Sequence, residues 1–326
     1  MIINDDCYGS VEITEEELIA IPSLPEMKRL KCVGQHGWTD IIHPELFVSR
    51  FEHTIGAGLL TRILRGSLEE QAAAFFHDIS HTAFSHAADY LYSPETDASF
   101  HEKELPTFFR LHAESMGKKP PNCPWDYFKL ADHSRYHLLE QAAPALCTDR
   151  LDYLFRDAFV LDLIDAEDIS TLIGGVCVEG GRLICRDLET AAALSELYDE
   201  ADRLLWRKTD YLGYNAFGAS IVKTCLESGI LEYKDLWSTD EQLIAGMFAG
   251  GNENVTNRLK ILLNRPAFIV DEIDYDLIIK SRIRYIDPEV VINRKCVHAS
   301  SLSENCRKIK EKAEAHARVN IPLRII

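Results

Sequence analysis

The chain has 326 residues, of which 46% are hydrophobic, so it is long enough to bury a substantial core without disulfides or a structural metal. Its 52 acidic residues against 35 basic ones give a formal net charge of -17. This surplus of negative charge opposes binding along extended nucleic-acid backbones or at anionic membranes, whereas a few local arginines and lysines can still hold a small anion.

The cysteines and the N-terminal residues favour a cytoplasmic protein. The nine cysteines are odd in number and contain no Cys-x-x-Cys pair, which is typical of reduced, buried thiols. Residues 1–17 are acidic and do not resemble a signal peptide, and no apolar segment reaches the length of a membrane-spanning helix. We therefore expect a cytoplasmic location and no membrane contact.

The apolar spacing up to about residue 160 is mostly helical and is interrupted at prolines, which predicts a helical bundle. One helix is expected over residues 49–64, and Ser67 is the expected N-cap of a second helix that runs to Phe76. Residues 149–157 alternate polar and apolar side chains at helical spacing, so one face of a third helix can present several polar groups inward.

Residues 175–185 alternate short β-prone runs about the pair Gly180-Gly181, which predicts a β-hairpin. Two further helices are expected over 191–211 and 215–227, and another starts at Thr239. On the first of these helices Arg203, Arg207 and Tyr211 would share one stripe.

Beyond about residue 267 the pattern predicts a small α+β lobe. The expected elements are strands over 268–270, 283–286 and 290–292 and a closing helix over 303–317. Lys280, Arg282 and Arg284 are expected on a solvated strand face, with an approach to an anion or another subunit as the alternative. We predict a helical domain over 1–230, including the hairpin, and a helical and α+β elaboration over 231–326.

Short polar motifs in the helical half carry the chemistry. The most informative is Phe75-Phe76-His77-Asp78, where an apolar helix ends on adjacent imidazole and carboxylate side chains. An Arg-x-x-His motif, from Arg50 to His53, lies upstream, and the run Asp149-Arg150-Leu151-Asp152-Tyr153 lies downstream. A His-Asp pair alone is common by chance, but in this order and context it resembles the HD-domain phosphohydrolase superfamily.

The resemblance implies a mainly α fold, the HD-type helical bundle, in which His53, His77, Asp78 and Asp149 bind one divalent metal ion. Imidazole nitrogen and carboxylate oxygen suit Mn, Fe, Co, Ni, Zn or Mg, and a set without thiolates disfavours a structural zinc site. Four protein ligands leave room for a water, which such an ion acidifies into a nucleophile while it neutralises charge on a phosphoryl group. Hydrolysis of a phosphate ester is therefore the expected chemistry.

Over roughly residues 25–230 the chain is most similar to the deoxynucleoside triphosphate triphosphohydrolase branch of this superfamily. The resemblance implies that Arg50 contacts substrate phosphate, which suits a planar guanidinium that can hold two phosphate oxygens. Gln35 and Asp157 would hold the sugar 3'-hydroxyl, with Tyr153 near the sugar. The complete set of implied substrate contacts is Gln35, Arg50, His81, Tyr153, Asp157, Arg203, Arg207 and Tyr211. Each has an ordinary structural alternative, such as a helix cap, a surface ion pair, a core tyrosine or a solvated helix face.

His86 is the expected general acid for the leaving oxygen, with Asp89 one turn further on to orient its ring, because a catalytic histidine needs such a partner. His101 is a second candidate for this role. His81 and His101 could instead bind phosphate as imidazolium, ligate a second metal, or be hydrogen-bonded interior histidines.

The chain departs from the branch at Ser80, at Thr82-Ala83 and at His36, which follows the sugar-reading Gln35. Substrate and regulation are therefore not carried over from the branch. The expected function is metal-dependent hydrolysis of a nucleotide phosphate ester. A deoxynucleoside triphosphate is the candidate substrate that the resemblance implies, with nucleoside and triphosphate as its products.

Three other functions stay open. They are a nucleotidase or phosphatase for other phosphate esters, an HD-type di-iron oxygenase, and a non-catalytic nucleotide sensor. An oxygenase needs two irons, whereas a phosphohydrolase can work with one ion, so a metal count separates these classes. A homo-oligomer is expected by analogy alone.

Overall fold

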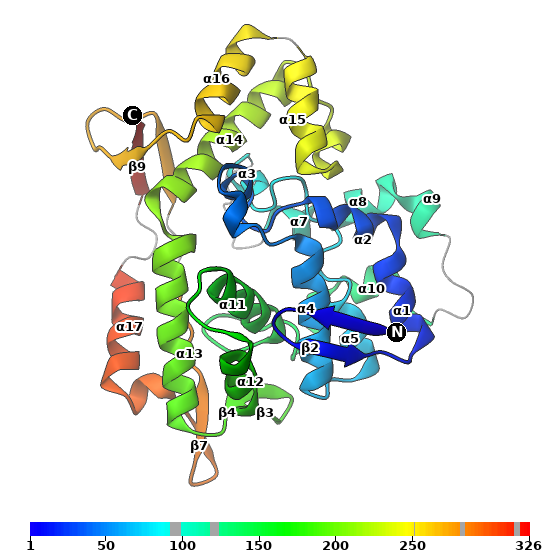
Figure 1. The fold of residues 1–326 in the computed structure, drawn as a ribbon, viewed down its shortest axis with the longest axis vertical. Helices are drawn as coiled ribbons and strands as arrows, with labels where there is room; N and C mark the ends of the chain where they lie inside the picture. Colours follow the sequence, from blue (N-terminus) through cyan, green and yellow to red (C-terminus); the bar gives the residue numbers. More distant parts are fainter. Residues whose placement is uncertain (92–98, 118–123, 251, 281–283, 316–319) are drawn as a thin grey trace.

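A computed structural model gives the fold and describes residues 1–91, 99–117, 124–250, 252–280, 284–315 and 320–326 (Figure 1). Within this part of the chain there are 17 α-helices and nine β-strands, so the protein is mainly α, as the sequence predicted. The helices up to residue 160 are α1 (Glu16–Ala20), α2 (Pro25–Arg29), α3 (Trp38–Ile42), α4 (Arg50–Ile63), α5 (Leu68–Ala74), α6 (Ala87–Leu91), α7 (Phe100–Lys103), α8 (Leu105–Leu111), α9 (Ala113–Met116), α10 (Tyr127–Leu130) and α11 (Thr148–Val160).

The later helices are α12 (Ala166–Gly174), α13 (Leu188–Ala201), α14 (Thr209–Glu227), α15 (Asp240–Ala249), α16 (Glu253–Leu263) and α17 (Glu304–Ala315). The strands are β1 (Ile2–Asp5), β2 (Gly9–Glu12), β3 (Val176–Glu179), β4 (Arg182–Cys185), β5 (Phe268–Val270), β6 (Leu277–Lys280), β7 (Glu289–Ile292), β8 (Lys295–His298) and β9 (Asn320–Ile325). No helix of the described residues is both long and apolar enough to cross a membrane.

Two helices that lead to the His-Asp motifs begin at capping boxes. At the start of α4 the Ser49 hydroxyl accepts a hydrogen bond from the backbone N–H of Glu52, and the Glu52 carboxylate accepts one from the backbone N–H of Ser49. Ser67 and Glu70 make the same pair of bonds at the start of α5. Each box satisfies two backbone donors that a helix end leaves unpaired, and both expected helix starts are confirmed.

Helix α4 packs closely against α11. Gly56 of α4 permits this approach, because a Cβ at that position would overlap the side chains of Arg156 and Asp152 on α11. The largest buried side chains of the core include Trp38, Phe75 and Phe155. The two helices thus lie close enough for their polar side chains to meet.

The helices of residues 191–227 divide at a different place from the predicted one. After α13 ends, a π-helical turn covers Asp202–Trp206, and α14 then runs unbroken from Thr209. The expected start near residue 215 was wrong because Gly213 lies inside the helix, where a Cβ would overlap Phe268 of β5. The prediction that Arg203, Arg207 and Tyr211 share one helical stripe is therefore also wrong, since Arg203 lies in the π turn and Tyr211 on α14.

The predicted hairpin is confirmed, with Glu179 paired to Arg182 across Gly180 and Gly181, which both have positive φ. It belongs to a four-stranded sheet with the order β3-β4-β7-β8, in which β4 and β7 are parallel. Strands from the C-terminal region thus pair with the hairpin of the helical region. A domain boundary near residue 230 stays a prediction.

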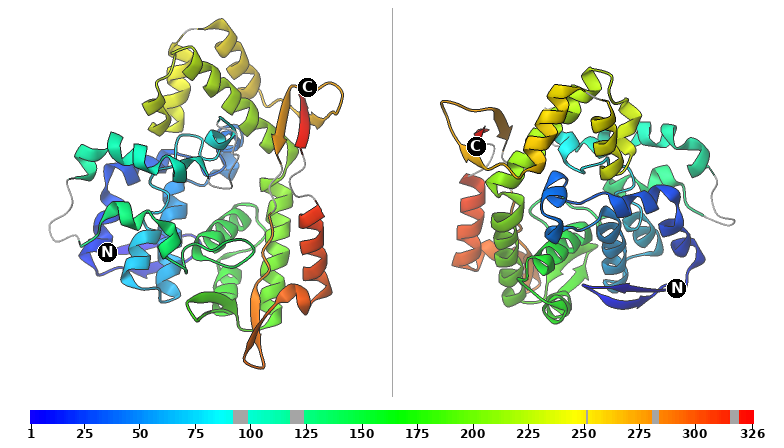
Figure 2. Two further views of the ribbon diagram at one scale, coloured as in Figure 1. Left: turned by 180° about the vertical axis from the view of Figure 1, so that it is seen from behind. Right: turned by 45° about the horizontal axis from the view of Figure 1, so that its top comes forward.

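The C-terminal region contains a second sheet with the order β5-β9-β6, which packs on α14. The expected strands over 268–270 and 290–292 are confirmed by β5 and β7, and the closing helix by α17, which runs beside α13 (Figure 2). The strand expected over 283–286 is wrong for residues 284–286, which are irregular, and residue 283 lies outside the described residues. Residues 316–317 of the expected closing helix, and Arg282 of the basic strand, also lie outside them.

Candidate metal centre and substrate cavity

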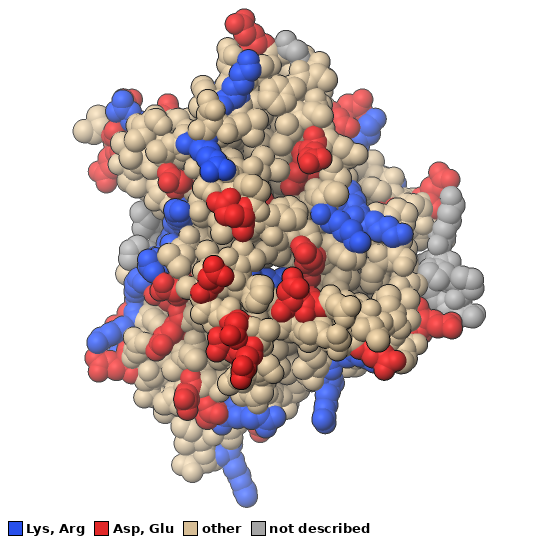
Figure 3. All heavy atoms as spheres, in the orientation of Figure 1, with Lys and Arg blue, Asp and Glu red and all other residues tan. Residues whose placement is uncertain are grey.

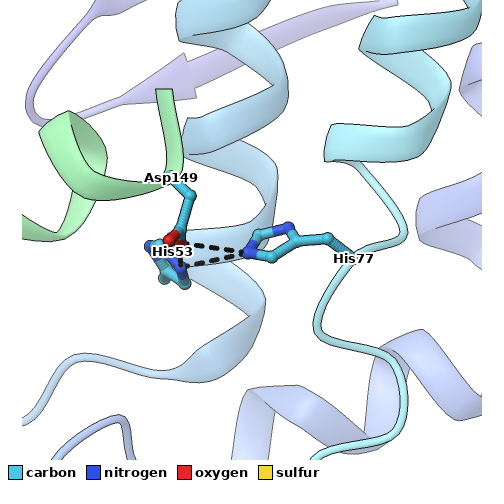
Figure 4. Close-up of side chains that lie close together, drawn as sticks. All are labelled: His53, His77 and Asp149. Carbon is cyan, nitrogen blue, oxygen red and sulfur yellow. Dashed lines mark hydrogen bonds and ion pairs between the residues drawn. The ribbon is translucent and has the colours of Figure 1, made fainter. Parts of the chain in front are cut away.

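Four predicted metal ligands converge from three segments of the chain. His53 comes from the first turn of α4, His77 from the turn that follows α5, and Asp149 from the first turn of α11 (Figure 4). Asp78 follows His77 in the same turn. His53 Nε2 lies 2.9 Å from Asp149 Oδ1, 3.2 Å from His77 Nε2 and 3.6 Å from Asp78 Oδ2. His53, His77 and Asp149 each bring one ligand atom within 4.8 Å of the others, and Asp78 adjoins them through its contact with His53.

The other ring nitrogens of the two histidines fix which nitrogen faces the centre. His77 Nδ1 lies 2.8 Å from the Ala74 carbonyl oxygen, which can only accept, so Nδ1 carries the proton. His53 Nδ1 lies 2.8 Å from a carboxylate oxygen of Asp152, which accepts in the same way. Each Nε2 thereby faces the centre and presents a lone pair to a metal ion when the ring is neutral, as in metal sites with ordered outer partners.

Carboxylates and imidazole nitrogens lie close together at the candidate metal centre. Burial lowers the pKa of His53, but hydrogen bonds to Asp149 and Asp152 and the field of Asp78 outweigh it and raise the pKa to about 10. The pKa of His77 is also raised, because Asp78 and Asp149 outweigh burial. A proton or a divalent cation can neutralise such a site, and the chemistry of this donor set fits a metal ion.

Arg50 is held beside the centre by three contacts. Its Nη1 donates to Asp78 Oδ2 at 2.7 Å, its Nε donates to Ser85 Oγ at 2.9 Å, and its Nη2 donates to the Gln35 carbonyl oxygen at 3.3 Å. Burial raises the pKa of Asp78, but Arg50, with His81 and His77, keeps it well below the ordinary value. Arg50 thus keeps Asp78 ionised and orients it, and its side chain also lines the cavity described below.

A second cluster adjoins the first through Asp78. His81 Nε2 lies 3.2 Å from Asp78 Oδ1, and the His81 and His101 rings stack with centroids 3.7 Å apart. Burial and the charge of Arg50 lower the pKa of His81 to about 3, and burial lowers that of His101 well below its ordinary value. Two neutral imidazoles and a carboxylate oxygen within 4.8 Å of one another have the composition of a metal site, rather than of a cationic phosphate site.

His86 lies at the mouth of this region with its side chain 44% exposed. Its Nδ1 lies 3.1 Å from Asp89 Oδ2, while Asp89 Oδ1 accepts a hydrogen bond of 2.7 Å from the backbone N–H of Phe100. Phe84 and Ser85 both adopt positive φ immediately before it, which is uncommon for residues other than glycine. The turn and the carboxylate thus hold the His86 ring in a fixed orientation.

Asp157 is surrounded by donors. His36 Nε2 lies 2.9 Å from its Oδ1, and Trp206 Nε1 donates to its Oδ2 at 2.6 Å, with Gln35 Nε2 3.5 Å from Oδ1. The other ring nitrogen of His36 lies 2.8 Å from Asp40. Burial lowers the pKa of His36, but Asp40 and Asp157 raise it to about 10, so an imidazolium bridges the two carboxylates.

A cavity of about 380 Å³ joins these groups. Its lining contains the four metal-ligand candidates together with eight other predicted site residues, which are Gln35, Arg50, His81, His86, His101, Tyr153, Asp157 and Tyr211. Asp89 lies behind His86. Arg203 and Arg207 do not line the cavity, since Arg203 pairs with Glu200 on the surface and Arg207 Nε lies 3.0 Å from Asp202 Oδ2.

Sequence reasoning missed several cavity residues. His36 was noted only as a departure, and Arg284 only as one of three basic residues on a strand, while Trp206 and Glu140 were not singled out. No local motif surrounds Trp206 or Arg284, since each reaches the cavity only through the tertiary fold. In Figure 3 a small patch of basic atoms is recessed near the centre of the face among acidic side chains.

Comparison with known proteins places these residues in a shared framework. The HD domain family model matches residues 50–157. The uncharacterized protein YdhJ of Bacillus subtilis is 32% identical over 338 residues, covering 100% of this chain and 99% of that protein. The metal-dependent phosphohydrolase cns2 of Cordyceps militaris is 28% identical over 305 residues, covering 89% of this chain and 85% of its own.

More limited matches occur with a larger enzyme. The deoxynucleoside triphosphate triphosphohydrolase SAMHD1 of Danio rerio is 30% identical over 109 residues, which is 29% of this chain and 17% of that protein. Among solved structures, a phosphohydrolase from Bacteroides thetaiotaomicron has a TM-score of 0.70 at 18% identity and covers 96% of this chain and 97% of its own. A hypothetical protein from Aquifex aeolicus has a TM-score of 0.65 at 16% identity and covers 97% of this chain and 99% of its own.

Proposed function

Because this chain belongs to the HD-domain family of metal-dependent phosphohydrolases, we propose that it hydrolyses a phosphate ester of a nucleotide at the cavity described above. The metal ion would be held by His53, His77, Asp78 and Asp149. The observation that carries this proposal is the convergence of two imidazoles and the Asp149 carboxylate on one point, with Asp78 adjoining them beside Arg50. This arrangement needs a cation and leaves a positive guanidinium next to it for an anionic substrate.

A divalent ion at this point supplies a water nucleophile near neutral pH and stabilises charge on phosphoryl oxygens. The protein side chains have separate tasks. Asp152 and the Ala74 carbonyl hold the rings of His53 and His77, and Arg50 holds Asp78. His86, oriented by Asp89 at 3.1 Å, is placed to protonate the leaving oxygen through Nε2, with His101 as the second candidate.

Three aromatic residues of the cavity lining support a nucleotide as substrate. They are Tyr153, Trp206 and Tyr211, and the Tyr153 and Trp206 ring centroids are 5.3 Å apart. Aromatic side chains of this kind offer flat apolar surface to a base or sugar. At about 380 Å³ the cavity is at the small end of the range for ligand sites, which fits one nucleotide better than an oligonucleotide.

Hydrolysis of a phosphomonoester, with release of orthophosphate, is the reaction we favour over release of triphosphate. Both oxygens of Asp157 already accept hydrogen bonds, so a sugar 3'-hydroxyl would have to displace His36 or Trp206. Two arginines expected to contact a triphosphate, Arg203 and Arg207, lie outside the cavity lining. The partial similarity to SAMHD1 keeps the triphosphohydrolase reaction as the competing outcome.

The test uses chelator-treated protein reloaded separately with Mn, Fe, Co, Ni, Zn and Mg. Nucleoside mono-, di- and triphosphates of both sugar types, and p-nitrophenyl phosphate, are offered, and products are resolved by mass. We expect orthophosphate, lost in Asp149→Asn and retained in the control Asp6→Asn, whose side chain lies on the surface. Triphosphate plus nucleoside would establish the competing reaction.

No turnover with any metal, together with two irons bound per chain, would refute hydrolysis and support an oxygenase. Binding of nucleotides without any turnover would instead support a sensor. A cytoplasmic location and homo-oligomerisation stay predictions from the sequence.

A further inference from the structure

Arg284 supplies a guanidinium to the cavity from outside the segment that matches the HD domain family model. It follows β6 in the chain and lies partly buried, with its Cζ 5.7 Å from the centroid of the Trp206 ring. An arginine over an aromatic face is held by cation–π attraction, while the N–H groups at its edge stay available as donors.

The other two arginines that line the cavity already donate hydrogen bonds to protein partners. Arg50 is bound to Asp78, Ser85 and Gln35, and Arg150 donates to the backbone carbonyls of Ala145 and Gln141. Arg284 has no hydrogen bond or ion pair with any residue that the structure describes. Its nitrogens are not among the buried unpaired atoms of the described residues, so these donors reach solvent and an anion that enters the cavity can accept from them.

The nearest acidic group does not fill this role. Asp202 contributes to the electrostatic field at Arg284, but its Oδ2 pairs with Arg207 at 3.0 Å and its buried Oδ1 makes no hydrogen bond to Arg284. The phenol oxygens of Tyr153 and Tyr198 are bonded to each other at 2.7 Å. The donors of Arg284 are thus left for a ligand in the cavity.

Aromatic rings connect Arg284 to the metal ligands. The Tyr153 ring lies 6.3 Å from the His53 ring and 5.3 Å from the Trp206 ring, and Arg284 Cζ lies 5.7 Å from the centroid of the Trp206 ring. Burial lowers the pKa of Arg284, but Tyr198, Tyr153, Asp202 and Tyr90 raise it, and none of the four metal-ligand candidates is among these groups. An anion at Arg284 would therefore be a different group from one held at those ligands.

We propose that Arg284 forms a second anion subsite, which binds a phosphate group of the substrate other than the one that is hydrolysed. The preferred substrate class is then a nucleotide with two separate phosphate groups, a nucleoside bisphosphate. The identity of this second group rests on the proposed function, whereas the anion-binding property of Arg284 does not require turnover.

The test measures binding to chelator-treated full-length protein, so that it is independent of catalysis. Adenosine 3',5'-bisphosphate and adenosine 5'-monophosphate are titrated while tryptophan fluorescence is followed, since Trp206 lies beneath Arg284. The wild-type protein is expected to bind the bisphosphate about 10- to 100-fold more tightly, the range of hydrogen bonds to charged groups. Arg284→Met, which keeps the aliphatic stem over Trp206, is expected to lose this preference.

Two further variants keep the result interpretable. Arg284→Lys retains the charge without the planar fork and is expected to keep part of the preference, even if Arg284→Met folds poorly. Arg307→Met on α17 removes a surface arginine with a 55% exposed side chain and is expected to bind like the wild type. An unchanged preference in folded Arg284→Met or Arg284→Lys protein, or no preference in the wild type, would overturn the subsite. Intact preference without turnover on any phosphate ester would overturn the proposed function and leave the subsite standing.

Discussion

Asp152 is the buried side chain on which the metal centre depends most. It is fully buried on α11, and its carboxylate accepts three hydrogen bonds, from Tyr8 Oη at 2.7 Å, His53 Nδ1 at 2.8 Å and Arg156 Nε at 2.9 Å. It therefore ties the N-terminal residues and α4 to α11. Asp152→Ala removes all three bonds and leaves Arg156 with Asp5 as its remaining carboxylate partner, at 2.7 Å.

The expected losses of unfolding free energy and of metal affinity follow from these contacts. Removing one partner of a buried ion pair destabilises a protein by about 3 to 5 kcal/mol, because the remaining charge stays buried. The remaining link between Arg156 and Asp5 places the expected loss toward the lower end of that range. The His53 ring also loses the acceptor that fixes its tautomer, which typically lowers metal affinity by about 10- to 100-fold.

Two measurements check this prediction. Urea denaturation of chelator-treated protein gives the loss of unfolding free energy, and competition with a chelator gives the metal affinity. Tyr8→Phe serves as the graded control, since it removes one of the three bonds and is expected to cost about 1.5 to 3 kcal/mol, with little change in metal affinity. If Asp152→Ala unfolds within about 1 kcal/mol of the wild type and keeps its metal affinity, the reasoning about this network is wrong.

Gly56→Ala is expected to lower the free energy of unfolding by about 1 to 3 kcal/mol, because the added Cβ overlaps Arg156 and Asp152. Thermal unfolding should show a lower midpoint, and an unchanged midpoint would contradict the packing argument. The pKa of His36 is raised to about 10, so its stabilising contribution is complete below pH 6.5 and is lost as pH rises toward 10. The stability difference between wild type and His36→Gln should therefore shrink across that interval in pH-dependent denaturation, and a constant difference would refute the ion bridge between Asp40 and Asp157. His86→Gln is expected to lower kcat by about 100- to 10,000-fold while metal content stays equal to the wild type, and normal turnover would remove His86 from proton transfer.

Local signals in the sequence account for much of the fold around the site. Ser49, Ser67 and Thr239 each precede a helix and pair with a polar side chain three residues on, so the helix starts could be predicted from neighbours in the chain. Gly180-Gly181 identifies its hairpin in the same way. The failure near residue 215 arose because Gly213 resembles a helix breaker, whereas its role is to admit Phe268 from a strand more than fifty residues later.

The same difference between local signals and long-range contacts applies to the candidate site. The His-Asp motifs gather as expected because each is fixed to the end of a helix that the sequence defines. Sequence spacing does not reveal which distant side chains donate hydrogen bonds to a buried carboxylate, so the bond from Trp206 to Asp157 could not be foreseen. Arg203 and Arg207 do not line the cavity, since Arg203 pairs with Glu200 and Arg207, at the end of the π turn, pairs with Asp202.

The charges around Asp78 bear on the choice between hydrolase and oxygenase. Asp78 and Asp149 carry two negative charges, whereas Arg50 and one divalent ion carry three positive ones, so a single ion leaves the centre with one positive charge for a phosphate to neutralise. A second divalent ion at Asp78, His81 and His101 would raise the excess to three positive charges, since both imidazoles are neutral. Arg50, fixed on Asp78 at 2.7 Å, would then lie beside two cations without a further carboxylate of the two clusters to offset them. A centre of this composition gains from an anionic substrate in either state, which favours phosphate ester chemistry over oxygenation of a neutral substrate.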